Sequence, residues 1–210
     1  KICHDAIIEL KSEELNRVWE EISNLKVLDP TCGSGAFLFS AMQLLESIYL
    51  QIISQAKILP EAPKFYEDII VHKNLNYYVA KKIALENLFG VDLMQEGIDV
   101  ANLRLYLALV SRLNKISEIE PMPILEFNIR RGNLLVGFTN LQELAQKNET
   151  GSLAIYADSK KILSLIEEIN SDIEALNKGQ LDTDIFSREV EKQRSIRSKL
   201  SRLKGLTNTL

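Results

Sequence analysis

The sequence predicts a doubly wound α/β fold, in which helices cover both faces of a parallel sheet. Short apolar segments that end in turn residues alternate with longer segments whose apolar residues recur every three or four positions. Parallel strands need crossover connections, and the predicted helices supply them. The chain has 210 residues, of which 46% are hydrophobic and 26% charged, so it is long enough to bury a core.

Three short strands are predicted from apolar runs that stop at turn residues. They are residues 25–28, 88–92 and 124–129. The first strand stops at Asp29 and Pro30, and the second ends in the carboxylate of Asp92. Ligands of open parallel sheets bind outside the carboxyl ends of the strands, so we expect the chemistry at this edge.

Four helical segments surround these strands. They are residues 5–23, 37–53, 64–87 and 95–113. The second strand ends 57 residues after Gly35, whereas a minimal β-α-β unit places an acidic residue about 20 residues after its glycine loop. We therefore expect a helical insertion at about 58–86.

Two domains are predicted: residues 1–150, which hold the sheet, and residues 151–210, which form a helical hairpin with a turn at Gly179 and Asp182. The segment 185–210 carries seven basic and two acidic residues. A basic patch can bind nucleic acid, but acidic and apolar residues interrupt this one, which favours a solvated helix face.

Composition excludes several classes of protein. No run of 18 apolar residues and no signal-peptide pattern occurs, so we expect a cytoplasmic protein without a membrane span. Cys3 and Cys32 form no Cys-x-x-Cys pair, which disfavours disulfide and zinc chemistry. His4 and His72 have no partner at the spacing of metal ligands, so no metal site is expected.

The loop after the first strand, residues 29–37, reads Asp-Pro-Thr-Cys-Gly-Ser-Gly-Ala-Phe. Its glycines allow a ligand to approach the backbone closely, although a tight turn would have the same pattern. A dinucleotide-binding loop needs a third glycine where this chain has Leu38, and a nucleophile elbow needs one at Cys32. A phosphate-binding loop needs Gly-Lys-Ser/Thr, but Ala-Phe follows Gly35.

The other two loops carry polar residues at the same edge. The Asp92 carboxylate can accept hydrogen bonds from both hydroxyls of a ribose, or it can cap the helix that follows. Leu93 beside it is suited to packing against an adenine ring. Asn133 follows the third strand, and its amide can bind a purine edge or stabilise a turn.

Together, residues 29–37, 89–93 and 128–135 resemble the S-adenosylmethionine-binding motifs of gamma-type adenine-N6 DNA methyltransferases. The likeness covers about 18–138 and is strongest to the methylase part of type IIG restriction-modification enzymes. It implies a Rossmann-like methyltransferase sheet with S-adenosyl-L-methionine as the cofactor. The residues that it implies around the methionine part are Asp29, Thr31, Gly33, Gly35 and Phe37. It implies Asp92 at the ribose and Asn133 at the adenine. The remaining residues assigned to this site are Pro30, Leu93 and Leu134.

The family transfers a methyl group to adenine in DNA with an Asn/Asp-Pro-Pro-Tyr/Phe motif, and this sequence has no Pro-Pro pair. No catalytic residue is therefore assigned. The missing motif and a first residue that is not methionine predict a piece of a longer enzyme, inactive alone, whose endonuclease and target-recognition domains lie outside this chain. Two alternatives stay open: a methyltransferase acting on RNA or protein, and a non-catalytic scaffold whose 158–204 hairpin binds a partner.

Overall fold

The computed structural model describes residues 7, 10–115, 118, 122–135, 164–176 and 194–201. The chain divides into two compact units, Lys1–Asn133 and Leu134–Leu210. Each unit is described by itself. The predicted domain boundary at residue 150 lies outside the described residues.

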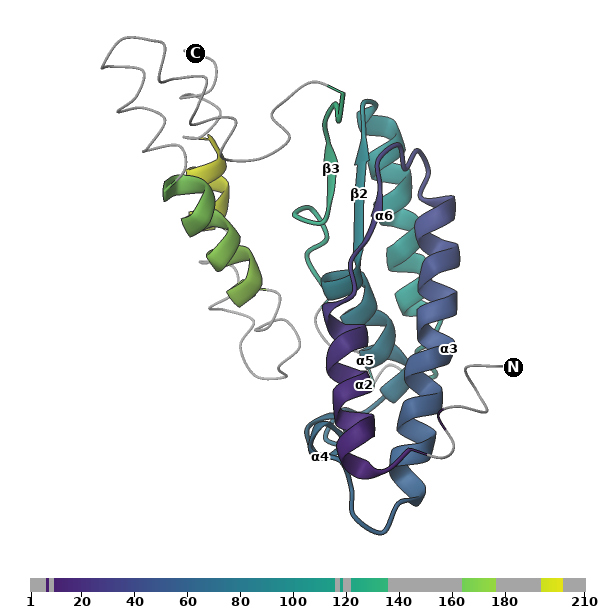
Figure 1. Ribbon diagram of the computed structural model, residues 1–210. Coiled ribbons are helices and arrows are strands. Elements are labelled where there is room, and N and C mark those ends of the chain that lie inside the picture. The colour runs from purple at the N-terminus through teal and green to yellow at the C-terminus, as the bar shows by residue number, and fades with distance from the viewer. Residues whose placement is uncertain are drawn as a thin grey trace. The chain divides into compact units, whose positions relative to one another are not determined.

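The first unit alternates helices and strands as predicted (Figure 1). In chain order the elements are α2 (Ser12–Asn24), β1 (Val27–Asp29), α3 (Ala36–Ile58), α4 (Lys64–Ile69), α5 (Leu75–Lys82), the π-helical turn η1 (Ile83–Asn87), β2 (Leu88–Asp92), α6 (Gln95–Val110) and β3 (Ile129–Arg131). The predicted helix at 64–87 is divided, because Asn74 caps a new helix by accepting a hydrogen bond from the Tyr77 amide (3.0 Å).

The three strands form a parallel sheet in the order β1-β2-β3. Asp29 is in register with Gly90, and Asp92 is in register with Arg131. The central strand β2 therefore extends two residues beyond β1 at the carboxyl edge. The small parallel sheet confirms the α/β class.

The predicted third strand, residues 124–129, is wrong in its position: β3 is Ile129–Arg131, and residues 126–128 form a turn. The cause is Asn128, which is buried and donates its Nδ2 hydrogens to carbonyls within η1 and at the start of β2. The acceptors are Ala84 (3.2 Å), Leu85 (2.7 Å) and Leu88 (3.2 Å). These hydrogen bonds hold residues 126–128 in a turn, so β3 begins only at Ile129.

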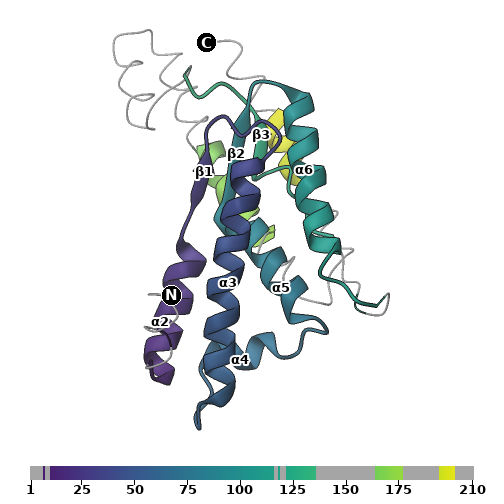
Figure 2. The same ribbon diagram turned by 90° about the vertical axis from the view of Figure 1, so that its right-hand side faces the viewer.

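Helices α3 and α6 lie on the same face of the sheet (Figures 1 and 2). Among the described helices, α3 has the length and apolar composition that could cross a membrane. Here it packs in the core of the first unit, and its fully buried side chains are Leu38, Met42, Tyr49 and Ile52. A helix that is apolar on most sides is also typical of a buried core position.

An aromatic cluster joins the helices at the amino end of the sheet. Trp19 of α2 stacks on Phe65 of α4 with ring centroids 4.4 Å apart, and it meets the edge of Tyr49 at 4.9 Å. Lys82 lies over the Trp19 ring and forms an ion pair with Glu86 (2.5 Å). The cluster thus ties α2, α3, α4 and α5 together by packing and a cation–π contact.

Asn87, at the end of η1, is fully buried and fixes the connection into β1. Its Nδ2 donates to the carbonyls of Ile22 (2.7 Å) and Leu25 (2.8 Å), and the Tyr49 hydroxyl donates to its Oδ1 (3.3 Å). Burial raises the pKa of Tyr49 to about 12, so this hydroxyl stays protonated and available as a donor.

We expect Asn87→Ala to lower the free energy of unfolding by roughly 1–3 kcal/mol. The partly buried Leu25 carbonyl loses this donor and the buried Tyr49 hydroxyl loses an acceptor, whereas the Ile22 carbonyl keeps the Leu25 amide. Urea denaturation followed by circular dichroism measures this. Asn24→Ala is the matched control, since Asn24 is exposed at the end of α2. Equal losses in the two variants would contradict the role of Asn87.

In the second unit, the described residues 164–176 and 194–201 are helical, within the predicted hairpin. Lys199 bridges Asp172 (2.5 Å) and Glu168 (2.7 Å). The hydrogen bonds to these carboxylates raise the pKa of Lys199. The two helical segments are therefore linked by an ion-pair network.

Candidate functional site

The carboxyl edge of the sheet brings together the loops that follow β1, β2 and β3. The Cys32 amide donates to the Val91 carbonyl (2.9 Å), and the Gly132 amide donates to the Asp92 carbonyl (2.9 Å). Both neighbouring loops are thereby attached to the end of β2. The edge that the sequence predicted as the ligand site is thus a continuous backbone surface.

The loop after β1 is a tight turn built from its own polar groups. The Thr31 amide donates to Asp29 Oδ1 (3.2 Å), and the Gly35 amide donates to the Cys32 carbonyl (2.7 Å). Gly33 and Gly35 have φ angles of +49° and +73°, a region that other residues enter at a cost. The loop therefore forms the tight strand-to-helix turn. Its backbone is also open to a ligand at Gly33, because a Cβ there would meet no atom within 4 Å.

Asp92 links the first loop to the second. Its Oδ2 accepts the Gly33 amide hydrogen at 2.8 Å, and its Oδ1 accepts that of Met94 at 2.9 Å. The backbone hydrogen bonds from Met94 and then Gly33 lower the pKa of the Asp92 carboxyl. The expected role of Asp92 as the cap of α6 is wrong: the N-cap residue is Met94, which has no side-chain cap hydrogen bond. Asp92 instead holds the turn that leads into the helix, because it accepts the Met94 amide hydrogen. Each oxygen keeps a further lone pair for a ligand hydroxyl.

Two residues of α6 support this edge and were not assigned from the sequence. A Cβ on Gly97 would lie 3.1 Å from the Gly33 carbonyl oxygen and 3.5 Å from Asp92 Oδ1. A Cβ on Gly35 would lie 2.9 Å from the Cβ of Ala101. The available signal was Gly97 itself, because a glycine inside a helix weakens it and indicates close packing.

Cys32 is buried beneath the loop rather than exposed to a ligand. Its Sγ lies 3.0 Å from the position of a Cβ on Gly90, so the bare backbone of β2 makes room for it. Burial, followed by the nearby charges of Asp29 and Asp92, raises the pKa of the thiol. Cys32 is thus a protonated packing residue.

Exposed apolar side chains surround the polar edge of the first unit. They are Phe37, Leu93 and Met94. Arg131 donates from Nε to the Leu93 carbonyl (3.0 Å) and so attaches the second loop to β3. Pro30, Thr31 and Asn133 are also exposed. Leu134, assigned from the sequence, is exposed and begins the second unit; its place in the site stays a prediction.

Comparison with known proteins identifies the family of this fold and site. A model of the MmeI DNA-methyltransferase domain matches residues 6–128, which contain the elements from α2 to α6. The chain belongs to the MmeI DNA-methyltransferase domain family. Membership confirms the resemblance to the methylase part of restriction-modification enzymes. No solved structure matches the chain.

A curated relative supports the same assignment. The chain is 32% identical over 155 residues to a protein of Methanocaldococcus jannaschii described as a candidate type II restriction enzyme and methyltransferase. The match covers 70% of this chain and 11% of that protein. The MmeI-like chain therefore spans about a tenth of the length of this relative.

Gly33→Ala and Gly35→Ala form a matched pair, because both change a glycine of the same loop with positive φ. We expect Gly33→Ala to cost about 1–2 kcal/mol of stability through φ alone. Gly35→Ala is expected to cost roughly 1–3 kcal/mol more, because its Cβ collides with Ala101. Equal losses in urea denaturation would show that α3 and α6 do not meet at Gly35.

The bonds of Asp92 also predict a pH dependence. A carboxyl whose pKa is lowered by folding stabilises the protein above its ordinary pKa, and this stabilisation is lost as the pH falls through the lowered pKa. We therefore expect Asp92→Asn to lower the Tm at about pH 7, and the difference from wild type to shrink towards about pH 3. A constant difference across this range would contradict the role of the ionised carboxylate.

Proposed function

We propose that this chain is the S-adenosyl-L-methionine-binding part of a DNA adenine-N6 methyltransferase of a restriction-modification system. The observation that carries the proposal is the hydrogen bond from the Gly33 amide to Asp92. It holds the glycine loop after β1 against the acidic end of β2, so both lie at the carboxyl edge of the sheet. The match to a DNA-methyltransferase domain favours DNA over RNA or protein as the substrate.

The residues at this edge fit the three parts of the cofactor. Asp92 has free lone pairs for the ribose hydroxyls, and the space in front of Gly33 admits a ligand to the backbone. Exposed Leu93 supplies an apolar surface for the adenine ring, and the amide of Asn133 suits its edge. We assign Asp29, Pro30, Thr31, Gly35 and Phe37 to the methionine part and Leu134 to the adenine end.

The bound cofactor would supply an electrophilic methyl group. The chain's own residues would hold and orient that group and keep it at the carboxyl edge. We assign no residue to the methyl-transfer step, because the chain has no Pro-Pro pair. By itself it is therefore not expected to methylate DNA.

We infer further that the three strands belong to a larger Rossmann-like sheet. Their parallel order and the position of the glycine loop at their carboxyl edge support this. The name of the archaeal relative combines restriction and methylation, which supports DNA as the partner of the full-length protein. Fused endonuclease and target-recognition domains, of type IIG, are part of the same proposal.

Isothermal titration calorimetry with S-adenosyl-L-methionine tests the proposal. We expect the wild-type chain to bind and Asp92→Ala to bind roughly 10–100-fold more weakly, because the charged acceptor of the ribose hydroxyls is lost. Gly33→Arg is expected to abolish binding, since its side chain fills the open space in front of the loop.

Asp99→Ala is the control, because Asp99 lies on α6 and its carboxylate accepts a hydrogen bond from Gln95 (2.9 Å). It should bind as well as wild type. Circular dichroism verifies that each variant is folded. A folded wild-type chain with no measurable binding would refute the cofactor assignment. Equal affinities for wild type and Asp92→Ala would refute the contact of Asp92 with the ribose.

A further inference from the structure

Helix α6 has a second apolar face that its own unit does not cover. Its inner face is buried and consists of Ile98, Ala101, Leu105, Ala108 and Leu109. Its outer face carries Val100, Leu103, Leu107 and Val110, which are between 46 and 61% exposed. We call these four residues the α6 stripe. Exposed apolar stripes of this kind mark interaction surfaces.

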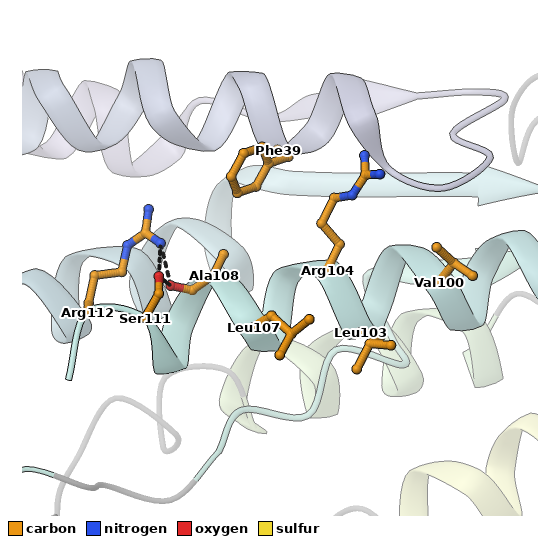
Figure 3. Close-up of a pocket in the computed structure, with 8 residues that line it drawn as sticks. All are labelled: Phe39, Val100, Leu103, Arg104, Leu107, Ala108, Ser111 and Arg112. Atoms are coloured by element: carbon orange, nitrogen blue, oxygen red, sulfur yellow. Dashed lines mark hydrogen bonds between the residues drawn. The ribbon is translucent and has the colours of Figure 1, made fainter.

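The stripe borders a groove between α3 and α6 (Figure 3). Phe39 of α3 forms one wall, and Val100, Leu103, Leu107 and Ala108 of α6 contribute apolar surface. The groove has a volume of about 510 Å³. It is therefore large enough to receive apolar side chains from an opposing helix.

The spacing and the types of the residues in the α6 stripe indicate which partner can pack against it. Its residues follow one another at spacings of three, four and three, which is the pattern of a helix that packs along another helix. The types, Val-Leu-Leu-Val, read the same in both directions. A twofold axis across the middle of the stripe would therefore place Val100 against Val110 and Leu103 against Leu107 of a second copy.

Charges at the ends of the stripe agree with an antiparallel pair. Glu96 and Asp99 lie at the start of α6, and Lys115, which has Glu118 beside it, follows its end. Reversing the second helix opposes the two helix dipoles favourably and separates the acidic starts of the two copies. Parallel pairing would instead place like charges together.

We propose that the α6 stripe binds a second copy of this chain as an antiparallel helix pair. The proposal is independent of cofactor binding. The stripe spans about three turns of one helix in each copy, which is a small patch beside the roughly 1,200 Å² or more that a standard interface buries. Arg104 also lines the groove beside the axis, so two like charges approach each other there. A weak dimer, with a dissociation constant in the micromolar range, is therefore expected.

Analytical ultracentrifugation of the 210-residue chain from about 1 to 100 µM tests the proposal, since this range spans a micromolar dissociation constant. Wild type should change from monomer to dimer, and Leu103→Glu should stay monomeric because it buries a carboxylate in each half of the interface. Val71→Glu is the matched control, as Val71 is equally apolar and 70% exposed outside the stripe. Arg104→Gln should tighten the dimer several-fold.

Disulfide trapping tests the orientation, with Cys3 replaced by Ser and the buried Cys32 retained. Mixing Val100→Cys chains with Val110→Cys chains should produce a mixed disulfide, whereas each variant alone should not cross-link. Cross-linking of Val100→Cys with itself would overturn the antiparallel arrangement. A folded wild-type chain that is monomeric up to 100 µM would overturn the dimer and favour a helix of a longer polypeptide as the occupant.

Discussion

The hydrogen bond from the Gly33 amide to the Asp92 carboxylate is the contact on which the carboxyl edge depends. It joins residues that are 59 positions apart and belong to the loops of two adjacent strands. Without it, the glycine loop would be held mainly by the Cys32 amide on β2 and by the packing of Gly35 on Ala101. Because the same carboxylate also accepts the Met94 amide, one ionised group orders both loops and the start of α6.

Two buried asparagines set the position of β2, and thereby that of Asp92. Asn87 ties the chain before β2 to the end of α2 and the start of the β1 segment. Asn128 ties the chain before β3 to η1. Both side chains donate to backbone carbonyls at the junction of a helix and a strand, where the helical and the strand hydrogen-bond patterns meet. The short strands are therefore placed by side-chain hydrogen bonds as well as by their own ladders.

The sequence predicted most elements of the first unit. The prediction of β2 at 88–92 agrees residue for residue, because polar Asn87 precedes the apolar run and Asp92 ends it. Hydrophobic periodicity describes the inward face of a segment, so it located α3 and α6 but missed their ends by up to five residues. It placed the third strand too early, because Asn128 acts through carbonyls about forty residues away. The loops of the site were predictable from Asp29, the glycines and Asp92. Gly97 indicated close packing, but its contact with the Gly33 carbonyl was not predictable, since that contact exists only once α6 has packed on the loop.

Helix α6 combines three roles along its length: support of the site, packing in the core and an exposed apolar surface. Its first turn contacts the glycine loop through Gly97, its inner face packs in the core, and its outer face carries the stripe. Its end is fixed by Arg112, which forms two hydrogen bonds with Glu46 of α3 at 2.9 and 2.6 Å. A rigid α6 clamped at both ends can present Val100 and Val110 in a constant register. The outer face can therefore take part in association without displacing the first turn that supports Gly33.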